Sequence, residues 1–392
     1  MEFIHLHNHS HYSLLDAIST IDGLINAAAE FNMPAVALTD HGVMYGTMEF
    51  YKKAKQKNIK PIVGCEVYVA QSGTRFDKNK RSTVRTAEDF DDDAPENSDG
   101  LVSANINYAH LILLAKNEIG YRNLIKLTSI GHTEGYYYKP RIDLEVLSKY
   151  HEGLVATSAC AGGVISCYIT RGDMKSAEKM TGVYKEIFGD DFYLEIQDHG
   201  IEAEKKVMKE MPGLAKKFGI KLIATNDVHY IKKEHAIAHN IYLNISAKQS
   251  NKNFRNGDAS DVLTNLRYGT DQIYFKSSEE MCRLFSDFPE AITSTLEVTE
   301  KCNLELDTSA NHMPNFKIPS SEKDSKNYDD YLRKLSFEGL KKRFDVIPVN
   351  AEERLNYEFD IIKRMDFSGY FLIVQYFINY ARSIGILVGT GR

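Results

Sequence analysis

The sequence predicts an α/β fold in which seven strands alternate with helices, an arrangement compatible with a distorted seven-stranded barrel. Three observations support this prediction. Short apolar runs recur through the first 230 residues, and most of the segments between them have helical periodicity. Most of the runs are almost continuously apolar, which is typical of strands in a parallel sheet that is covered on both faces.

The seven expected strands follow one another at intervals that leave room for a connecting helix. They are Phe3 to Leu6, Ala35 to Leu38, Pro61 to Val69, His110 to Ala115, Gly153 to Ala156, Phe192 to Ile196 and Lys221 to Ala224. Apolar residues recur at helical spacing between most of them. The expected helices are Thr20 to Phe31, Tyr45 to Lys57, Glu118 to Ile130, Met174 to Phe188 and Ile201 to Phe218.

The strand rhythm stops after about residue 235, and helical patterns dominate the rest of the chain. Polar passages at 248–261 and 318–327 are candidate linkers. The stretch 83–103 is rich in acidic residues and poor in apolar ones, so we expect a mobile insertion there.

The bulk composition is that of a globular protein of two or three domains, with 392 residues, 43% hydrophobic and 26% charged. A net charge of -6 provides no general basic field for nucleic acid, so any DNA contact must be local. No apolar run is long enough to span a bilayer, and the first residues do not have the pattern of a signal peptide. We therefore expect a cytoplasmic protein without a membrane partner. Five cysteines with no Cys-x-x-Cys pair argue against disulfides or a zinc ribbon.

Residues able to bind metal gather at the ends of the expected strands. In a parallel barrel the carboxyl ends of the strands converge on one mouth, so ligands far apart in the sequence become neighbours. His110 is the exception, because it begins its apolar run instead of ending it. The candidates are His7, His9, Asp16, His41, Glu66, His110, Cys160, Asp227 and His229.

Imidazole, carboxylate and one thiolate are suitable ligands for zinc or manganese, and a carboxylate such as Glu66 can bridge two ions. Paired ions favour the hydrolysis of phosphate esters. Taken singly, each residue has a plainer interpretation. A lone His-x-His is often an exposed strand end, and Cys160 alone is more often a small buried apolar residue. Their recurrence at strand after strand is what supports a shared site.

These residues lie in motifs that resemble those of the polymerase and histidinol phosphatase (PHP) family. Further phrases resemble the α-subunit family of bacterial DNA polymerase III, and this resemblance covers almost the whole chain. The motifs are 5–10 (HLHNHS), 12–16 (YSLLD), 39–42 (TDHG), 59–66 (IKPIVGCE), 135–141 (GYYYKPR), 158–160 (SAC), 226–229 (NDVH), 275–281 (FKSSEEM), 289–291 (PEA) and 369–374 (GYFLIV).

The resemblance implies a PHP-type barrel at 1–275 and the amino-terminal part of a polymerase palm at 276–392. It also implies two or three zinc or manganese ions. One would be bound by His7, His9, Glu66 and Asp227, a second by Glu66, His110 and Cys160, and a third by Asp16, His41 and His229. Glu66, Asp227 and His9 would be catalytic in a 3'-5' exonuclease. Family members with a full ligand set can have that activity, whereas others keep only the scaffold.

The resemblance also implies partners for the parent polymerase. They are the 3' end of a DNA primer-template, a separate proofreading exonuclease subunit and the sliding clamp, with magnesium serving polymerisation. Two departures from the family pattern are Thr390, where proline is usual, and Tyr376, where aspartate is usual. Since the sequence ends at Arg392, before the expected phosphate-binding turn and palm carboxylates, we expect no polymerisation by these residues alone.

Two other interpretations stay open at this point. In the first, the domain is a metal-stabilised scaffold that supports the palm and docks the proofreading subunit. In the second, the chain is a stand-alone PHP phosphoesterase. Structural ions also need ligands, so an intact ligand set is compatible with the scaffold. The residues from Glu234 to Arg392 argue against a compact phosphatase.

Overall fold

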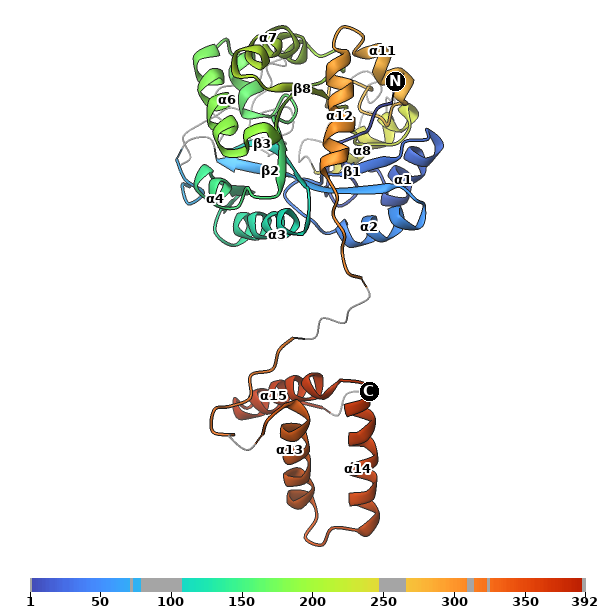
Figure 1. The fold of residues 1–392 in the computed structure, drawn as a ribbon, viewed down its shortest axis with the longest axis vertical. Helices are drawn as coiled ribbons and strands as arrows, with labels where there is room; N and C mark the ends of the chain where they lie inside the picture. The colour runs from blue at the N-terminus through green and yellow to red at the C-terminus, as the bar shows by residue number, and fades with distance from the viewer. Residues whose placement is uncertain are drawn as a thin grey trace. The chain divides into compact units, whose positions relative to one another are not determined.

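The structure, a computed structural model, describes residues 2–70, 73–78, 108–246, 266–308, 314–322 and 325–389. The chain forms two compact units, Met1–Leu306 and Asp307–Arg392, which are described separately (Figure 1). The expected insertion at 83–103 and the expected linker at 248–261 lie outside the described residues. Within the described part of the chain, no helix combines the length and apolar character that a membrane span requires.

A curled mixed sheet forms the centre of the first unit, and its strand order is β4-β5-β2-β3-β6-β7-β8, with β1 paired to β2. Six of the seven expected strands are present at the expected places. The strands are β1 (Ala35–Leu38), β2 (Lys60–Ala70), β3 (Tyr108–Ala115), β4 (Tyr136–Tyr137), β5 (Lys139–Ile142), β6 (Leu154–Thr157), β7 (Phe192–Ile196) and β8 (Lys221–Ala224). The hairpin of β4 and β5 was not predicted.

The seventh expected strand, near the amino terminus, joins the two ends of this order without forming a regular strand. On one side Ala37 N donates to His5 O (2.9 Å), and on the other His9 N donates to Val228 O (2.8 Å). Asn8 and Val228 form a parallel bridge. Residues 5–9 therefore lie between β1 and the chain that follows β8, as expected for a distorted seven-stranded α/β barrel.

The expectation of an all-parallel sheet is wrong for one of the expected strands, and the unexpected β4 is also antiparallel to its neighbour β5. β3 runs antiparallel to both of its neighbours, β2 and β6, whereas the β1–β2, β6–β7 and β7–β8 pairs are parallel. The amino end of β3 consequently lies beside the carboxyl ends of the other strands, which is why His110 can share their mouth although it begins its run.

Helices cover the outside of the strands (Figure 1). The five expected helices are present, and Met174–Phe188 has the predicted bounds. Side chains of Thr20 and Asn117 cap α1 and α3 by accepting from Gly23 N and Gly120 N, as N-cap residues do. The helices are α1 (Ile21–Glu30), α2 (Thr47–Gln56), α3 (Glu118–Thr133), α4 (Leu144–Lys149), α5 (Val164–Thr170), α6 (Met174–Phe188), α7 (Glu202–Phe218), α8 (Ala236–Ser246), α11 (Ser278–Leu284) and α12 (Pro289–Lys301).

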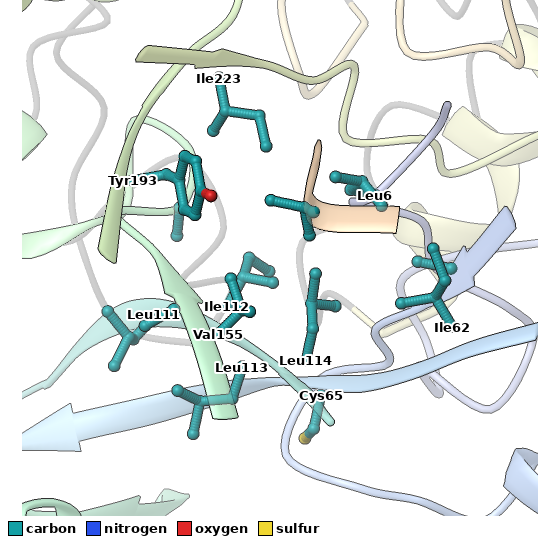
Figure 2. Packing of buried hydrophobic residues seen from close by; sticks show 14 of the residues in the cluster. Leu6, Ile62, Cys65, Leu111, Ile112, Leu113, Leu114, Val155, Tyr193 and Ile223 are labelled. Atoms are coloured by element: carbon teal, nitrogen blue, oxygen red, sulfur yellow. The ribbon is translucent and has the colours of Figure 1, made fainter. Parts of the chain in front are cut away.

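The outward-facing side chains of the strands pack against these helices. Figure 2 shows apolar side chains of β2, β3, β6, β7 and β8 on both faces of the sheet, among them the fully buried Leu113 on the outer face and Ile223 on the inner face. Replacing a buried leucine such as Leu113 by alanine typically costs about 2–5 kcal/mol. Since successive residues of a strand alternate in direction, the opposite faces of the same strands are available for a polar interior.

The first compact unit runs past the predicted boundary at residue 275. Helix α12 buries Ala291, Ile292 and Val298, and the hydroxyl of Thr295 accepts from Ile4 N (3.2 Å). The division into a barrel at 1–275 and a palm segment at 276–392 stays a prediction, because a compact unit is not the same as a functional domain.

The second unit is helical, as expected for the end of the chain. It contains α13 (Tyr328–Arg343), α14 (Val349–Arg364) and α15 (Ser368–Ser383). Tyr331, Leu332, Phe359 and Leu372 form its small core. The motif at 369–374 lies in the first half of α15.

Candidate metal centre

Glu66 lies at the centre of the polar interior and is completely buried. It is on β2, one residue past Cys65, whose side chain packs into the apolar core on the opposite face. The two carboxylate oxygens of Glu66 face different groups of side chains. Oε2 lies near His7, His9 and His41, whereas Oε1 lies near His110 and Cys160.

The first group consists of four buried side chains, His7, His9, Glu66 and Asp227. His7 Nε2 is 3.1 Å from Glu66 Oε2, 3.1 Å from Asp227 Oδ1 and 3.2 Å from His9 Nε2. His9 Nε2 is 3.0 Å from Glu66 Oε2 and 3.2 Å from Asp227 Oδ1. These are five of the six edges of the tetrahedron that the four ligand atoms define, and the sixth, between the Glu66 and Asp227 oxygens, is no longer than 4.8 Å. Separations of this size suit ligands of one ion, since zinc bonds to nitrogen and oxygen are roughly 2.0–2.2 Å long.

The second group joins three strands or strand ends. His110 Nδ1 is 2.9 Å from Glu66 Oε1, and Cys160 Sγ is 3.7 Å from His110 Nδ1 and 3.8 Å from Glu66 Oε1. The longer separations involve sulfur, as expected because zinc–sulfur bonds are about 2.3 Å long. In the β2–β3 register Glu66 pairs with Ile112, so His110, two residues away, lies on the same face.

The third group lies at the more exposed side of the cluster. Asp16 Oδ2 is 3.0 Å from His41 Nε2 and 3.1 Å from His229 Nε2. The side chains of Asp16 and His41 are 21% and 11% exposed, in contrast to the fully buried Glu66. Tyr268 closes this group from one side, since its hydroxyl donates to Asp16 Oδ1 (2.7 Å) and lies 3.1 Å from His229 Nε2.

All nine residues that the sequence singled out thus come together in one cluster. Regular alternation places His7 and His9 on the same side of their segment, as predicted. Asp227 is in a left-handed backbone conformation with φ of 41°, which is uncommon for a residue other than glycine. The preceding residue holds this turn, because Asn226 Nδ2 donates to Tyr274 O (2.7 Å) and Asn226 Oδ1 accepts from Lys276 Nζ (2.8 Å).

Charges in the cluster are strongly coupled. Burial would raise the pKa of Glu66, but the nearby imidazoles of His110 and His7 outweigh it and hold that pKa well below its usual range. Burial would lower the pKa of His9, but hydrogen bonds to Asp227 and Glu66 raise it to about 10. For His41, burial and the neighbouring His9 lower the pKa to about 4. The carboxylates therefore attract positive charge into the space enclosed by the first group of four residues.

A cation at this point would take the place of those protons. The donor set of nitrogen, carboxylate oxygen and one thiolate fits zinc or manganese. Metal binding to such ligands releases protons, so affinity falls as the pH is lowered. If both of the groups that face Glu66 held a metal ion, its two oxygens could each bind one of them.

Sequence reasoning missed the residues that surround these ligands. Ser13 Oγ lies 3.0 Å from His9 Nδ1 and donates to Asp40 Oδ1 (2.9 Å), so this pair orients His9. Glu195 contacts His7, and Tyr268 contacts Asp16. Ser13 lies in one of the family-like motifs but has no metal-binding group, and Glu195 is an isolated acid in a buried strand. Its position inside an otherwise apolar run, Phe192–Ile196, was the one available signal.

Two family models match this chain. Residues 5–199 match the PHP domain, and residues 330–392 match the bacterial DNA polymerase III alpha NTPase domain. The whole chain is similar to DNA polymerase III subunit alpha of Treponema pallidum (40% identity) and of Borreliella burgdorferi (41% identity). The chain spans 31% of the length of each of these two relatives.

Similarity to solved structures is slight. An amidohydrolase from Chromobacterium violaceum matches with 15% identity and a TM-score of 0.37, covering 58% of this chain and 87% of that one. A match at that level does not bear on function.

Proposed function

Because this chain carries a PHP domain and is homologous along its whole length to DNA polymerase III α subunits, we propose that it is part of a replicative DNA polymerase whose PHP domain hydrolyses phosphodiester bonds as a 3'-5' exonuclease. The observation that carries the proposal is the placement of Glu66. One of its oxygens faces His7 and His9, and the other faces His110 and Cys160.

The nine ligands would hold two or three zinc or manganese ions. When bound, such ions supply a nucleophile from water near neutral pH and stabilise the charge that develops on the phosphate. The protein's own contribution is to fix the ligands. Ser13 orients His9, and Tyr268 holds Asp16 and His229 together. Substrate would approach from the side of Asp16 and His41, where the cluster is least covered.

The polymerase context supports DNA as the substrate. The proposed partners are the 3' end of a primer-template and, through the parent protein, a separate proofreading subunit and the sliding clamp, with magnesium serving polymerisation. A role in DNA replication would place the protein in the cytoplasm. The net charge of -6 disfavours tight binding by the isolated chain, so salt should suppress its activity steeply.

One observation favours the second candidate, a metal-stabilised scaffold. His7, His9 and Glu66 are completely buried, as ligands of a structural ion commonly are. An ion bound there stabilises the fold whether or not a substrate reaches it. The exposed fractions of Asp16 and His41 are the reason for placing hydrolysis first.

The test is an assay with an end-labelled single strand and a mismatched primer-template, incubated with manganese or zinc. Wild-type protein should remove nucleotides from the 3' end, and Asp227→Asn and His9→Ala should abolish the reaction. Equal cleavage by all three proteins would assign the activity to a contaminant. No cleavage by metal-loaded wild type would favour the scaffold.

A further inference from the structure

A buried acid outside the nine ligands lies directly behind one of them. Glu195 is in β7, is 1% exposed, and its Oε1 lies 2.8 Å from His7 Nδ1. The hydroxyls of Thr157 and Thr225 and the amide of Gln197 also contact its two oxygens. These contacts follow from the strand register, because Thr157 pairs with Tyr193 and Ile223 pairs with Glu195, which puts all these side chains on the inner face.

The surroundings of Glu195 suit an ionised carboxylate, which can only accept hydrogen bonds. Hydroxyls and an amide group donate to it. Because an ionised carboxylate only accepts, its remaining neighbour, His7 Nδ1, must also donate a hydrogen bond to it. A neutral imidazole that donates from Nδ1 has its lone pair on Nε2. That atom is the corner of the tetrahedron shared with His9, Glu66 and Asp227.

We propose that Glu195 is a positioning residue of the metal centre: it fixes the ring orientation and tautomer of His7 and increases the basicity of Nε2 towards a bound ion. This inference rests on the proposed function, since it needs the His7 group to bind metal. Carboxylate partners of metal-binding histidines act in this way, and losing one typically weakens metal affinity about 10–100-fold.

The chain contains a matched control in the same region. His199 Nδ1 lies 2.6 Å from Glu204 Oε1, and both side chains are buried, as His7 and Glu195 are. His199 Nε2, however, faces the carbonyl oxygen of Asn226 (3.1 Å) instead of the ligand cluster. Glu204→Gln therefore disturbs a buried carboxylate–histidine pair without changing a ligand.

The experiment measures zinc and manganese affinity of the full chain by competition with a chromogenic chelator. Glu195→Gln should bind the tightest ion about 10–100-fold more weakly than wild type, with the same number of ions at saturation. Glu204→Gln should match wild type. Equal affinity of Glu195→Gln and wild type would overturn the inference alone, and equal losses in both variants would reduce it to a packing effect. Wild-type protein that binds no metal would instead overturn the proposed function.

A second readout separates positioning from folding. Urea unfolding in the presence of a chelator shows whether each metal-free variant folds. If Glu195→Gln does not fold, Glu195→Asp takes its place. Its shorter side chain withdraws the charge from His7, so it should show the same loss of metal affinity. In zinc-loaded protein the Nδ1 proton of His7 should resonate far downfield, because its acceptor is charged. It should move upfield in Glu195→Gln and stay unchanged in Glu204→Gln. An unmoved resonance would contradict the proposal.

Discussion

One carboxylate, that of Glu66, connects the two most buried groups of candidate ligands. Its Oε2 is 3.1 and 3.0 Å from the Nε2 atoms of His7 and His9, and its Oε1 is 2.9 Å from His110 Nδ1. A sequence motif can indicate that a glutamate is a ligand. Only the structure assigns its two oxygens to different neighbours, and this assignment is the ground for proposing two ions instead of one.

A histidine next to this cluster should control the stability of the fold at low pH. Burial lowers the pKa of His5 to about 3, against an ordinary value near 6.5. Below pH 6.5 His5 therefore binds a proton in the unfolded chain but not in the folded one. As the pH falls towards 3, this difference lowers the free energy of unfolding by an increasing amount. At pH 5 this cost is about 2 kcal/mol relative to pH 8.

The measurement is urea unfolding of wild type and His5→Gln at pH 8 and pH 5, in chelator. Glutamine can replace the contact between His5 Nε2 and Lys276 O (2.8 Å) and does not titrate. The variant should gain about 2 kcal/mol relative to wild type between the two pH values. A difference between the two proteins that is independent of pH would contradict the assignment of a neutral His5.

At the scale of elements, strand direction explains which ligands could be foreseen. Seven of the nine candidates lie on the segment 5–16 or follow an apolar run, and Glu66 lies within one; an all-parallel sheet is enough to bring these eight together. His110 needs an antiparallel β3, which a continuous apolar run does not reveal. The hairpin of β4 and β5 was missed because its few residues, rich in tyrosine, have no measurable periodicity.

Side chains that orient the ligands could not be predicted for a different reason. Glu195, Tyr268 and Asn226 act through contacts with residues far away in the sequence, and their own surroundings contain no repeated spacing. A single sequence shows which residue types can bind a metal. It does not show which buried polar groups support them.

The hydroxyl of Tyr268 supports the third ligand group, and this can be tested. Tyr268→Phe removes the hydroxyl that contacts Asp16 and His229. It should weaken binding of the ion at these residues about 10–100-fold and leave the more buried ions unaffected. Titration calorimetry with manganese should therefore lose its weakest binding phase.

The control for this change is Tyr274→Phe, because the Tyr274 hydroxyl donates to Glu280 (2.7 Å), outside the ligand cluster. It should bind all ions as wild type does. Unchanged binding by Tyr268→Phe, or equal losses in both variants, would show that the hydroxyl of Tyr268 does not support the third group.

At the scale of the whole molecule, bound metal should be part of the stability of the first compact unit. An ion at 100 times its dissociation constant stabilises the folded state by about 2.7 kcal/mol. For a unit of this size, removing it should lower the melting temperature by roughly 4 °C. Scanning calorimetry with and without a chelator measures the shift.

The comparison includes His9→Ala, in which the chelator should have a smaller effect because one corner of the tetrahedron is missing. A transition arising from the second compact unit, which contains none of the nine ligands, should not move. A melting curve of wild-type protein that is insensitive to chelator would argue against metal bound by the folded state.

Glu66 is proposed to join two metal ions, and elemental analysis tests this role most directly. Wild-type protein purified in excess metal should retain two or three zinc or manganese ions per chain after desalting. Glu66→Gln should lose more than one of them, whereas Glu204→Gln, also a buried acid, should lose none. Less than half an ion per chain in wild type, or the loss of no more than one ion in Glu66→Gln, would contradict the multinuclear centre.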